Sequence, residues 1–222
     1  MADVLASIVT PTFPGREEVL LQRCMPSIAK QDWGGRIEHV ILSDRNPDLR
    51  DAIQDYLLDT NNDVDVRFAE INETWRNPIT EKSIGAVPWC IGTLMALGEF
   101  VGFVGDDDEL LPEHVSLHVA AMREAQAMFS ISQVEFRANG QTHAVIGDDT
   151  FAHGHLDATG IMCHISALSV ATWSANGENA ADWRLVRDWC DAGLRGVHVP
   201  QVTGIHNDGW LIGATGRPDR PQ

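Results

Sequence analysis

Positive charge is scarce in this 222-residue chain, and so are cysteines and long apolar runs. Sixteen lysines and arginines stand against 32 aspartates and glutamates. The resulting formal charge of -16 argues against a broad binding surface for nucleic acid or anionic membranes. No apolar segment approaches the length of a membrane span, and the N-terminus resembles a first β-strand more than a signal peptide because it lacks a basic region. We therefore expect a cytoplasmic protein with no stable membrane span.

The four cysteines lie far apart and form no Cys-x-x-Cys pair: Cys24, Cys90, Cys163 and Cys190. This spacing is typical of buried, reduced thiols and not of a disulfide framework. The hydrophobic fraction of 44% is ordinary for a globular protein with a real core. The length suits one sizeable domain, and the sequence contains no internal repeat.

Strand-like and helix-like segments alternate over the first half of the chain, which predicts βαβ units and a mainly parallel sheet. Strands are predicted at 4–10, 37–43, 64–71 and 100–104, and helices at 16–30, 49–58, 87–97 and from Pro112 onward. The second half is less regular. It predicts strands at 128–136, 142–146 and 197–200, a loop over 147–160 and a helix over 178–190.

Three consecutive carboxylates, Asp106, Asp107 and Asp108, follow the apolar strand predicted at 100–104. In open α/β sheets, ligands bind just outside the carboxyl ends of such strands. Three acids packed together repel one another, so we expect a cation there, and a hard divalent metal is the natural candidate. The alternative is an acidic loop that merely solvates the end of the strand.

Five further short motifs follow one another along the chain. They are Ser7-Ile-Val-Thr-Pro-Thr12, Ile41-Leu-Ser-Asp-Arg-Asn-Pro-Asp48, Ala96-Leu-Gly-Glu-Phe-Val101, Ala181-Asp-Trp-Arg-Leu-Val-Arg187 and Thr203-Gly-Ile-His206. Together with the acids before Pro112, their order and spacing resemble family-2-type glycosyltransferases of the GT-A fold, over nearly the whole chain. The resemblance implies an α/β, Rossmann-like fold, with a mainly parallel central sheet flanked by helices and a small mixed portion on the acceptor side.

The same resemblance implies how a single domain over 1–222 is divided. Residues 1–111 are expected to form the half that binds the nucleotide sugar, and 112–212 the half that holds the acceptor and the catalytic group. The segment 213–222 is expected to be a flexible tail because it is rich in glycine, proline and arginine.

The activity implied by the resemblance is metal-dependent, inverting glycosyl transfer from a nucleotide-diphosphate sugar, by default a UDP-sugar. Asp108 is expected to hold Mn²⁺ or Mg²⁺, with Asp106 or Asp107 assisting and His206 completing the metal shell. Asp182 is implied as the catalytic base that takes the proton of the acceptor hydroxyl. The implied acceptor is a glycan, a lipid-linked sugar or another hydroxyl compound, and the acidic balance disfavours a nucleic-acid acceptor.

The residues implied as contacts to the donor are Pro11, Thr12, Asp44, Asp106 and Asp107. The chain also departs from the family pattern at three places. Gly105 stands where the first acid of the metal motif is expected, Ser43 replaces an acid after the second strand, and Trp89-Cys90 replaces an Arg-Asn pair.

Several of these residues have ordinary structural explanations. An acid such as Asp182 in the first turn of a helix stabilises the helix dipole whether or not it does chemistry. Asp44 lies just before Asn46-Pro47, where it suits a turn cap. His206 is expected in a Gly-flanked loop, where a lone histidine is commonly solvated.

A competing hypothesis is a zinc-dependent hydrolase, because His153, His155 and Asp157 match a His-x-His-x-Asp pattern. His114 and His118 also have the i, i+4 spacing of a helical metal pair. A third hypothesis is a module that binds a nucleotide sugar without turning it over, and nucleotidyl transfer ranks below it. The family resemblance favours the glycosyltransferase.

Overall fold

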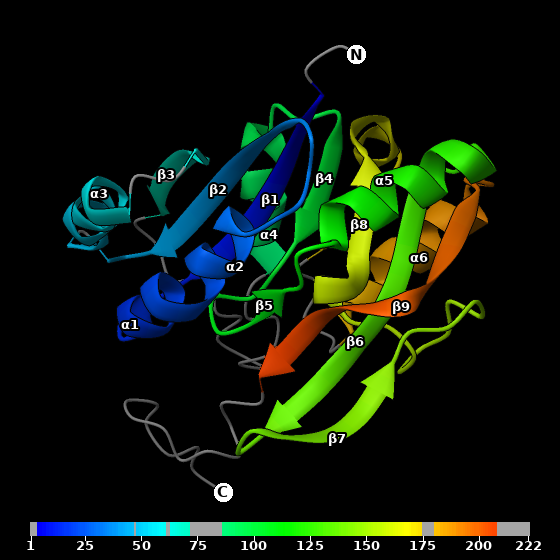
Figure 1. Ribbon diagram of the computed structural model, residues 1–222. Helices are drawn as coiled ribbons and strands as arrows, with labels where there is room; N and C mark the ends of the chain where they lie inside the picture. The colour runs from blue at the N-terminus through cyan, green and yellow to red at the C-terminus, as the bar shows by residue number, and fades with distance from the viewer. Residues whose placement is uncertain (1–3, 47, 61–62, 72–85, 175–179, 208–222) are drawn as a thin grey trace, which may run out of the picture.

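The described part of the chain forms one sheet with helices on both faces (Figure 1). The computed structural model describes residues 4–46, 48–60, 63–71, 86–174 and 180–207. Within these ranges, nine strands join in the order β3-β2-β1-β4-β8-β6-β9-β5, and β7 pairs with β6. None of the helices in these ranges is long and apolar enough to cross a membrane. The predicted tail at 213–222 lies outside the described residues.

The first half of the sheet is parallel, as the alternation of strands and helices predicts. Its strands are β1 (Leu5–Thr12), β2 (Arg36–Asp44), β3 (Asp65–Ile71) and β4 (Phe100–Phe103). β1 pairs with β2 and β4, and β2 pairs with β3, all in parallel. β1 and β4 are almost entirely buried, and burial on both faces explains the continuous apolar sequence of β4. Because the strands are parallel, their carboxyl ends meet at one edge of the sheet.

The second half of the sheet is mixed and larger than expected. Its strands are β5 (Glu109–Leu110), β6 (Phe129–Ala138), β7 (Gln141–Ile146), β8 (Ile161–His164) and β9 (Gly196–Asn207). β8 is antiparallel to β4 and β6, β9 is parallel to β6, and β5 and β7 are antiparallel to β9 and β6. The sequence patterns did not predict β5, which has two residues, or β8, which becomes a strand by pairing with β4 and β6.

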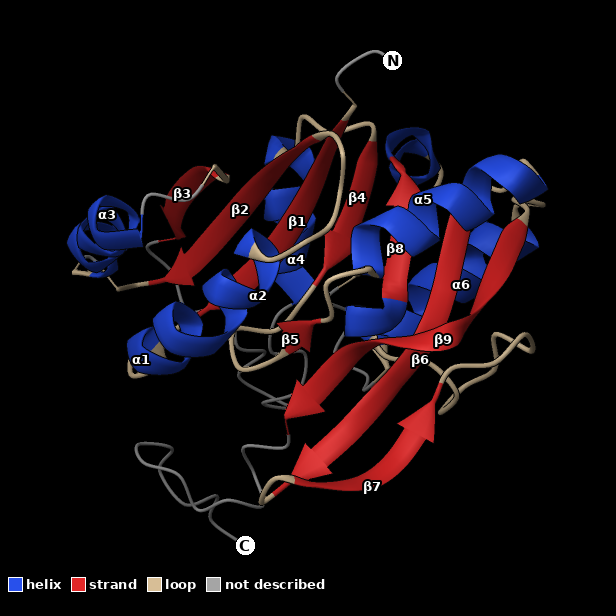
Figure 2. Ribbon diagram, in the orientation of Figure 1, coloured by secondary structure: helices blue, strands red, loops and turns tan. Residues whose placement is uncertain are grey.

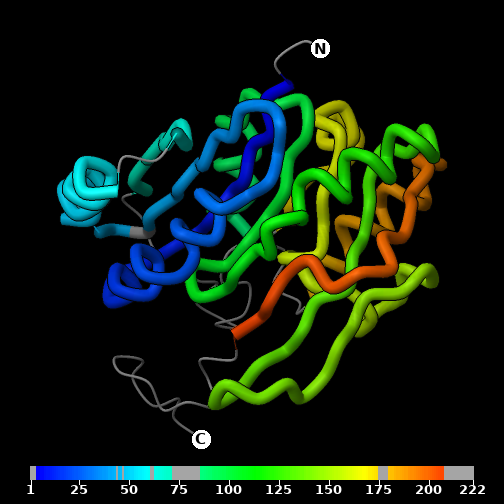
Figure 3. The backbone as a smooth tube through the Cα atoms, viewed as in Figure 1, coloured from blue at the N-terminus to red at the C-terminus, as the bar shows by residue number. Residues whose placement is uncertain are grey.

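Strand β9 continues well beyond the predicted end at Pro200 and runs beside β6 (Figure 3). The register between β6 and β9 shifts on both sides of Gln133, opposite the part of β9 that contains Pro200. Such an irregularity accommodates a residue that has no N–H to donate to the ladder. The expectation that His206 lies in a loop was therefore wrong, because this residue is on β9.

The helices lie on both sides of the sheet, with α2 and α5 on one face and α4 and α6 on the other (Figure 2). The predicted helix at 16–30 is one helical segment made of α1 (Glu17–Val19), a π-helical turn (Leu20–Cys24) and α2 (Met25–Ala29). The remaining helices are α3 (Leu49–Thr60), α4 (Ala86–Met95), α5 (His114–Ala125) and α6 (Ala181–Asp191), with 3₁₀ turns at Ala158–Gly160 and Ile165–Ser169. Each face of the sheet buries its own apolar cluster against these helices.

Candidate metal and donor site

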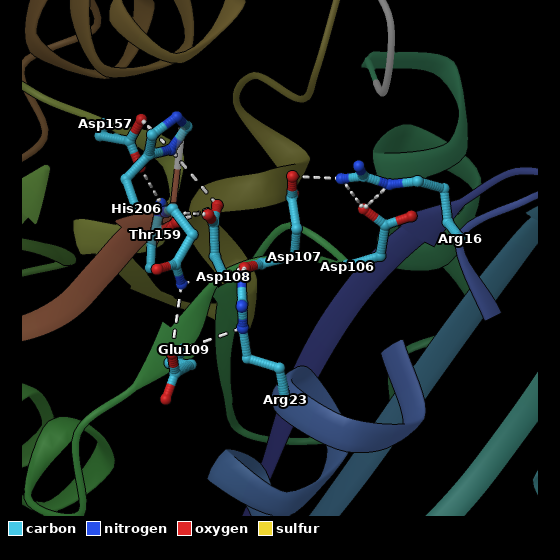
Figure 4. Close-up of polar contacts among 10 residues, drawn as sticks. Arg16, Arg23, Asp106, Asp107, Asp108, Glu109, Asp157, Thr159 and His206 are labelled. Atoms are coloured by element: carbon cyan, nitrogen blue, oxygen red, sulfur yellow. Dashed lines mark hydrogen bonds and ion pairs between the residues drawn. The ribbon is translucent and has the colours of Figure 1, made fainter. Parts of the chain in front are cut away.

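The three acids lie in the turn between β4 and β5, at the edge where the parallel strands end (Figure 4). Asp106 is buried and accepts hydrogen bonds from Thr12 Oγ1 at 2.8 Å and from Arg16 Nε and Nη2 at 3.2 and 2.9 Å. The same guanidinium also pairs with Asp107. The cation that compensates these two acids is thus Arg16, a role that the sequence argument gave to a metal.

Both partners of the main ion pair are shielded from water, since 12% of the Arg16 side chain and 6% of the Asp106 side chain are exposed. Burial works to lower the pKa of Arg16, but Asp106 and Asp107 outweigh it and raise that pKa. Burial raises the pKa of Asp106 to about 6, against the opposing influence of Arg16. Arg16 therefore stays charged and ties the loop after β1 to the acidic turn.

Asp108 faces away from Arg16 and is held by groups from the second half of the chain (Figure 4). Its Oδ1 accepts a hydrogen bond from the backbone N–H of Asn207 at 2.9 Å. Its Oδ2 accepts one from Thr159 Oγ1 at 3.2 Å and lies 3.4 Å from His206 Nδ1. Burial raises the pKa of Asp108, while His206 opposes that change.

The imidazole of His206 lies between two carboxylates. Its Nδ1 is 3.4 Å from Asp108 Oδ2 and 3.5 Å from Asp157 Oδ2. This buried nitrogen makes no hydrogen bond within the described structure. Burial works to lower the pKa of His206, but its interaction with Asp108 and the charges of Asp157 and Asp107 outweigh this and raise the pKa to about 10. The ring of Phe136 on β6 stacks on the imidazole, with centroids 4.5 Å apart.

Asp108, Asp157 and His206 offer a set of ligand atoms that lie within 4.8 Å of one another. Among the described residues, they are the one trio of acid, cysteine or histidine side chains close enough to hold a metal ion together. Two carboxylates with one imidazole suit a divalent cation such as Mn²⁺. The position of Nδ1 between the two acids, without a hydrogen bond, fits the same interpretation, because a divalent cation bound there would accept the lone pair of the neutral imidazole.

Asp157 is the member of this trio that the glycosyltransferase interpretation missed. The residue caps the 3₁₀ turn that follows it, since its Oδ1 accepts a hydrogen bond from the N–H of Thr159 at 2.9 Å. The sequence does hold a signal for this local structure, because aspartate is one of the residues preferred at such a cap. Its closeness to Asp108 and His206 arises from the packing of the 3₁₀ turn against β6, β9 and β4.

Asp182 lies in the first turn of α6, as the sequence predicts. Its Oδ1 accepts a hydrogen bond from the backbone N–H of Trp183 at 2.8 Å. Burial and, to a smaller extent, the charge of Asp157 raise the pKa of Asp182 to about 6, while His153 works in the opposite direction. The carboxyl group of Asp182 is thus influenced by the charge of Asp157, a member of this trio.

The residues expected to contact the donor lie at the same edge of the sheet. Pro11 and Thr12 end β1, and Thr12 is opposite Ser43 in the register with β2. Asp44 is the last residue of β2, and its side chain lies outside the described part of the structure. Asp106 joins this group through its hydrogen bond from Thr12.

The structure does not assemble the zinc cluster of the hydrolase hypothesis. His155 pairs with Asp148 at an exposed site, with Nδ1 and Oδ2 2.5 Å apart. His153 contacts Trp183 edge to face, with ring centroids 5.1 Å apart. Asp157 contacts neither histidine in the described structure and belongs to the other trio.

The i, i+4 pair on α5 consists of core histidines. His114 and His118 are fully buried, with ring centroids 4.4 Å apart. His114 Nδ1 is 2.8 Å from Thr203 Oγ1, and His118 Nδ1 is 2.7 Å from Ser130 Oγ. Burial lowers the pKa of His114 to about 4 and that of His118 well below its ordinary value. Both rings are therefore neutral at pH 7 and serve the packing of α5 on β6 and β9.

No protein-family model matches this chain, and no curated protein sequence matches it. Its fold nevertheless matches solved structures of other proteins. One is S. aureus TarS 1–349, with a TM-score of 0.69 and 16% identity over 91% of this chain and 60% of that one. The complex of TarS 1–349 with UDP-GlcNAc gives 0.69 and 17% identity, over 91% and 58% of the two chains.

A mannosyltransferase, PcManGT from Pyrobaculum calidifontis, matches in its complex with GDP-Man and Mn²⁺. The TM-score is 0.65 with 13% identity, over 90% of this chain and 56% of that one. The chain thus spans about three-fifths of the length of the structures it resembles. At such low identity the likeness establishes the mixed α/β, Rossmann-like fold that these nucleotide-sugar-binding proteins share with it.

Proposed function

We propose that this chain is a metal-dependent glycosyltransferase that moves a sugar from a nucleotide-diphosphate sugar, by default a UDP-sugar, to an acceptor hydroxyl. The observation that carries the proposal is the trio of Asp108, Asp157 and His206 at the carboxyl edge of the parallel strands. The fold supports it, since TarS and PcManGT bind UDP-GlcNAc and GDP-Man.

Asp108, Asp157 and His206 would hold Mn²⁺ or Mg²⁺. When bound, such a cation takes up negative charge that develops on the diphosphate leaving group. Arg16 pairs with Asp106 and Asp107, so these acids contribute less to the metal shell than the sequence alone suggested. We place Pro11, Thr12, Asp44, Asp106 and Asp107 on the donor side, where Thr12 and Arg16 hold the carboxylate of Asp106 in place.

Asp182 is the proposed base. The acceptor oxygen attacks the anomeric carbon, the bond from that carbon to the diphosphate oxygen breaks, and the acceptor proton passes to the carboxylate of Asp182. This direct displacement inverts the configuration at the anomeric carbon. The pKa of about 6 suits the task, because the group is ionised at pH 7 and is still a stronger base than an ordinary aspartate.

The test combines nucleotide binding with turnover. Thermal unfolding is measured with a panel of nucleoside diphosphates in the presence of Mn²⁺, Mg²⁺ or a chelator. A ligand at about 100 times its Kd adds roughly 2.7 kcal/mol to the stability of the folded state, so binding shows as a higher Tm. We expect one nucleotide to raise Tm only with metal, and Asp108→Ala to abolish the shift.

The base is tested with Asp182→Asn, which should keep the nucleotide-dependent shift and lose hydrolysis or transfer of the sugar. Asp63→Asn is the matched control, because Asp63 is an exposed acid outside the site. If Asp182→Asn turned over donor as the unchanged protein does, the base assignment would fail. If neither protein turned over any donor but both bound it with metal, the chain would be a binding module.

A further inference from the structure

Thr159 hydrogen-bonds to two of the three proposed metal ligands and packs against the strand that carries the third (Figure 4). It lies in the 3₁₀ turn Ala158–Gly160 and is 1% exposed. Its backbone N–H donates to Asp157 Oδ1 at 2.9 Å, and its hydroxyl donates to Asp108 Oδ2 at 3.2 Å. A buried residue that bridges two proposed ligands in this way fixes their relative positions.

These hydrogen bonds also determine which carboxylate oxygens face the metal. The backbone N–H of Thr159 donates a hydrogen bond to Asp157 Oδ1. The other oxygen, Oδ2, lies 3.5 Å from His206 Nδ1. On Asp108, the backbone N–H of Asn207 donates a hydrogen bond to Oδ1, and the hydroxyl of Thr159 donates one to Oδ2. A carboxylate oxygen has two lone pairs, so Oδ2 still has one for a cation.

The methyl group of Thr159 packs against β9, the strand that carries the third proposed ligand, His206. A Cβ built on Gly204 would lie 2.7 Å from Thr159 Cγ2, so only a glycine fits at that position of β9 without a shift. Gly204 is two residues before His206, and residues with this spacing point to the same face of a strand. Thr159 therefore packs against β9 on the face from which the imidazole projects.

We propose that Thr159 is a positioning residue that sets the geometry of Asp108, Asp157 and His206 for the cation. This inference rests on the proposed function, because it requires that these three side chains bind a divalent metal. Hydrogen-bond partners of metal ligands commonly contribute 10- to 100-fold to metal affinity. The hydroxyl and not the bulk of the side chain carries the effect.

The experiment measures Mn²⁺ binding to the purified chain without nucleotide, from the electron paramagnetic resonance signal of free Mn²⁺. Thr159→Val keeps the shape and the backbone N–H but removes the hydroxyl, and we expect the Kd for Mn²⁺ to rise about 10- to 100-fold. Thr159→Ser restores the hydroxyl and should bind within about threefold of the unchanged protein, by the same reasoning.

The matched control is Thr203→Val. Thr203 is a buried threonine on β9, and its hydroxyl hydrogen-bonds to Ser132 and His114 instead of the proposed metal ligands. It should lower Tm without changing the Kd for Mn²⁺. Equal Mn²⁺ affinity in Thr159→Val and the unchanged protein would overturn the role of Thr159 alone. Equal weakening in the Val and Ser variants would also overturn it, since packing would then be the cause. Absence of Mn²⁺ binding by the unchanged protein would overturn the metal-dependent function as well.

Discussion

At the scale of single residues, the structure gives a physical reason for the glycine at position 105. A Cβ at this position would lie 2.7 Å from Asp108 Oδ2, the atom that faces His206. The absence of a side chain thus leaves room for the carboxylate of Asp108. The chain has one acid of the triplet in the metal trio, while Arg16 holds the two others.

Gly105→Ala should therefore displace the carboxylate of Asp108 and weaken metal binding while the fold is kept. We expect the Kd for Mn²⁺ to rise on the order of 10-fold, because a displaced ligand costs at least as much as a lost partner of a ligand. Isothermal titration with Mn²⁺ measures the change. Gly34→Ala is the control, since nothing lies within 4 Å of a Cβ at that exposed position. Unchanged affinity in Gly105→Ala would contradict this account.

The ionisation of Asp182 gives a second prediction at the residue scale. The proposed base would act only as a carboxylate, so kcat/KM for donor and acceptor should rise with pH through about 6 and level off above pH 7. Burial is the largest cause of the raised pKa of Asp182, and a bound cation does not remove it. His153→Gln removes a group that lowers this pKa, so the rise should move to higher pH. A rate independent of pH between 5 and 7 would argue against Asp182.

At the scale of elements, the ion pair of Arg16 joins the loop after β1 to the turn after β4. Removing one partner of a buried pair leaves an uncompensated charge, which typically costs 3–5 kcal/mol. Arg16→Gln should lower the free energy of unfolding by about 3 kcal/mol at pH 7, measured by urea denaturation. The loss should shrink at pH 5, because Asp106, with its pKa of about 6, is then protonated and needs no cation.

The control for this prediction is Arg36→Gln. Arg36 pairs with Asp65 at 2.7 Å, but 57% and 61% of the two side chains are exposed. Exposed ion pairs contribute about 1 kcal/mol or less. Similar losses for Arg16→Gln and Arg36→Gln would show that the site gains no stability from burying its pair.

The elements also show how far the sequence predicts this fold. The parallel strands were predictable because β1, β2 and β4 have mainly apolar sequences and β3 alternates, and neither pattern needs knowledge of the neighbouring strands. β8 and the extension of β9 past Pro200 were not, since they depend on pairing with β6. The same distinction holds in the site. Asp108 and Asp182 have local motifs, whereas the proposed roles of Asp157 and Thr159 depend on the packing of the 3₁₀ turn beside β9.

At the scale of the whole molecule, buried neutral histidines make stability depend on pH. Burial lowers the pKa of His39 to about 3 and that of His114 to about 4. The unfolded chain binds protons near pH 6.5, so it gains protons before the folded chain does. The stability that these groups contribute is complete above pH 6.5 and is lost as the pH falls toward 4. Asp106 and Asp182 act in the opposite direction, because their pKa values are raised in the folded state.

Comparison of variants isolates the histidine contribution from these opposing acids. A shift from 6.5 to about 4 corresponds to roughly 3 kcal/mol for His114. In His114→Gln, the free energy of unfolding should therefore fall less steeply between pH 6.5 and pH 4 than in the unchanged protein, by about this amount. Urea denaturation at half-unit steps of pH measures both slopes. His143→Gln, at an exposed position on β7, is the control substitution. If His114→Gln had the same slope as the unchanged protein, the imidazole would have to be protonated without loss of packing, and the buried cluster on α5 would not limit stability in acid.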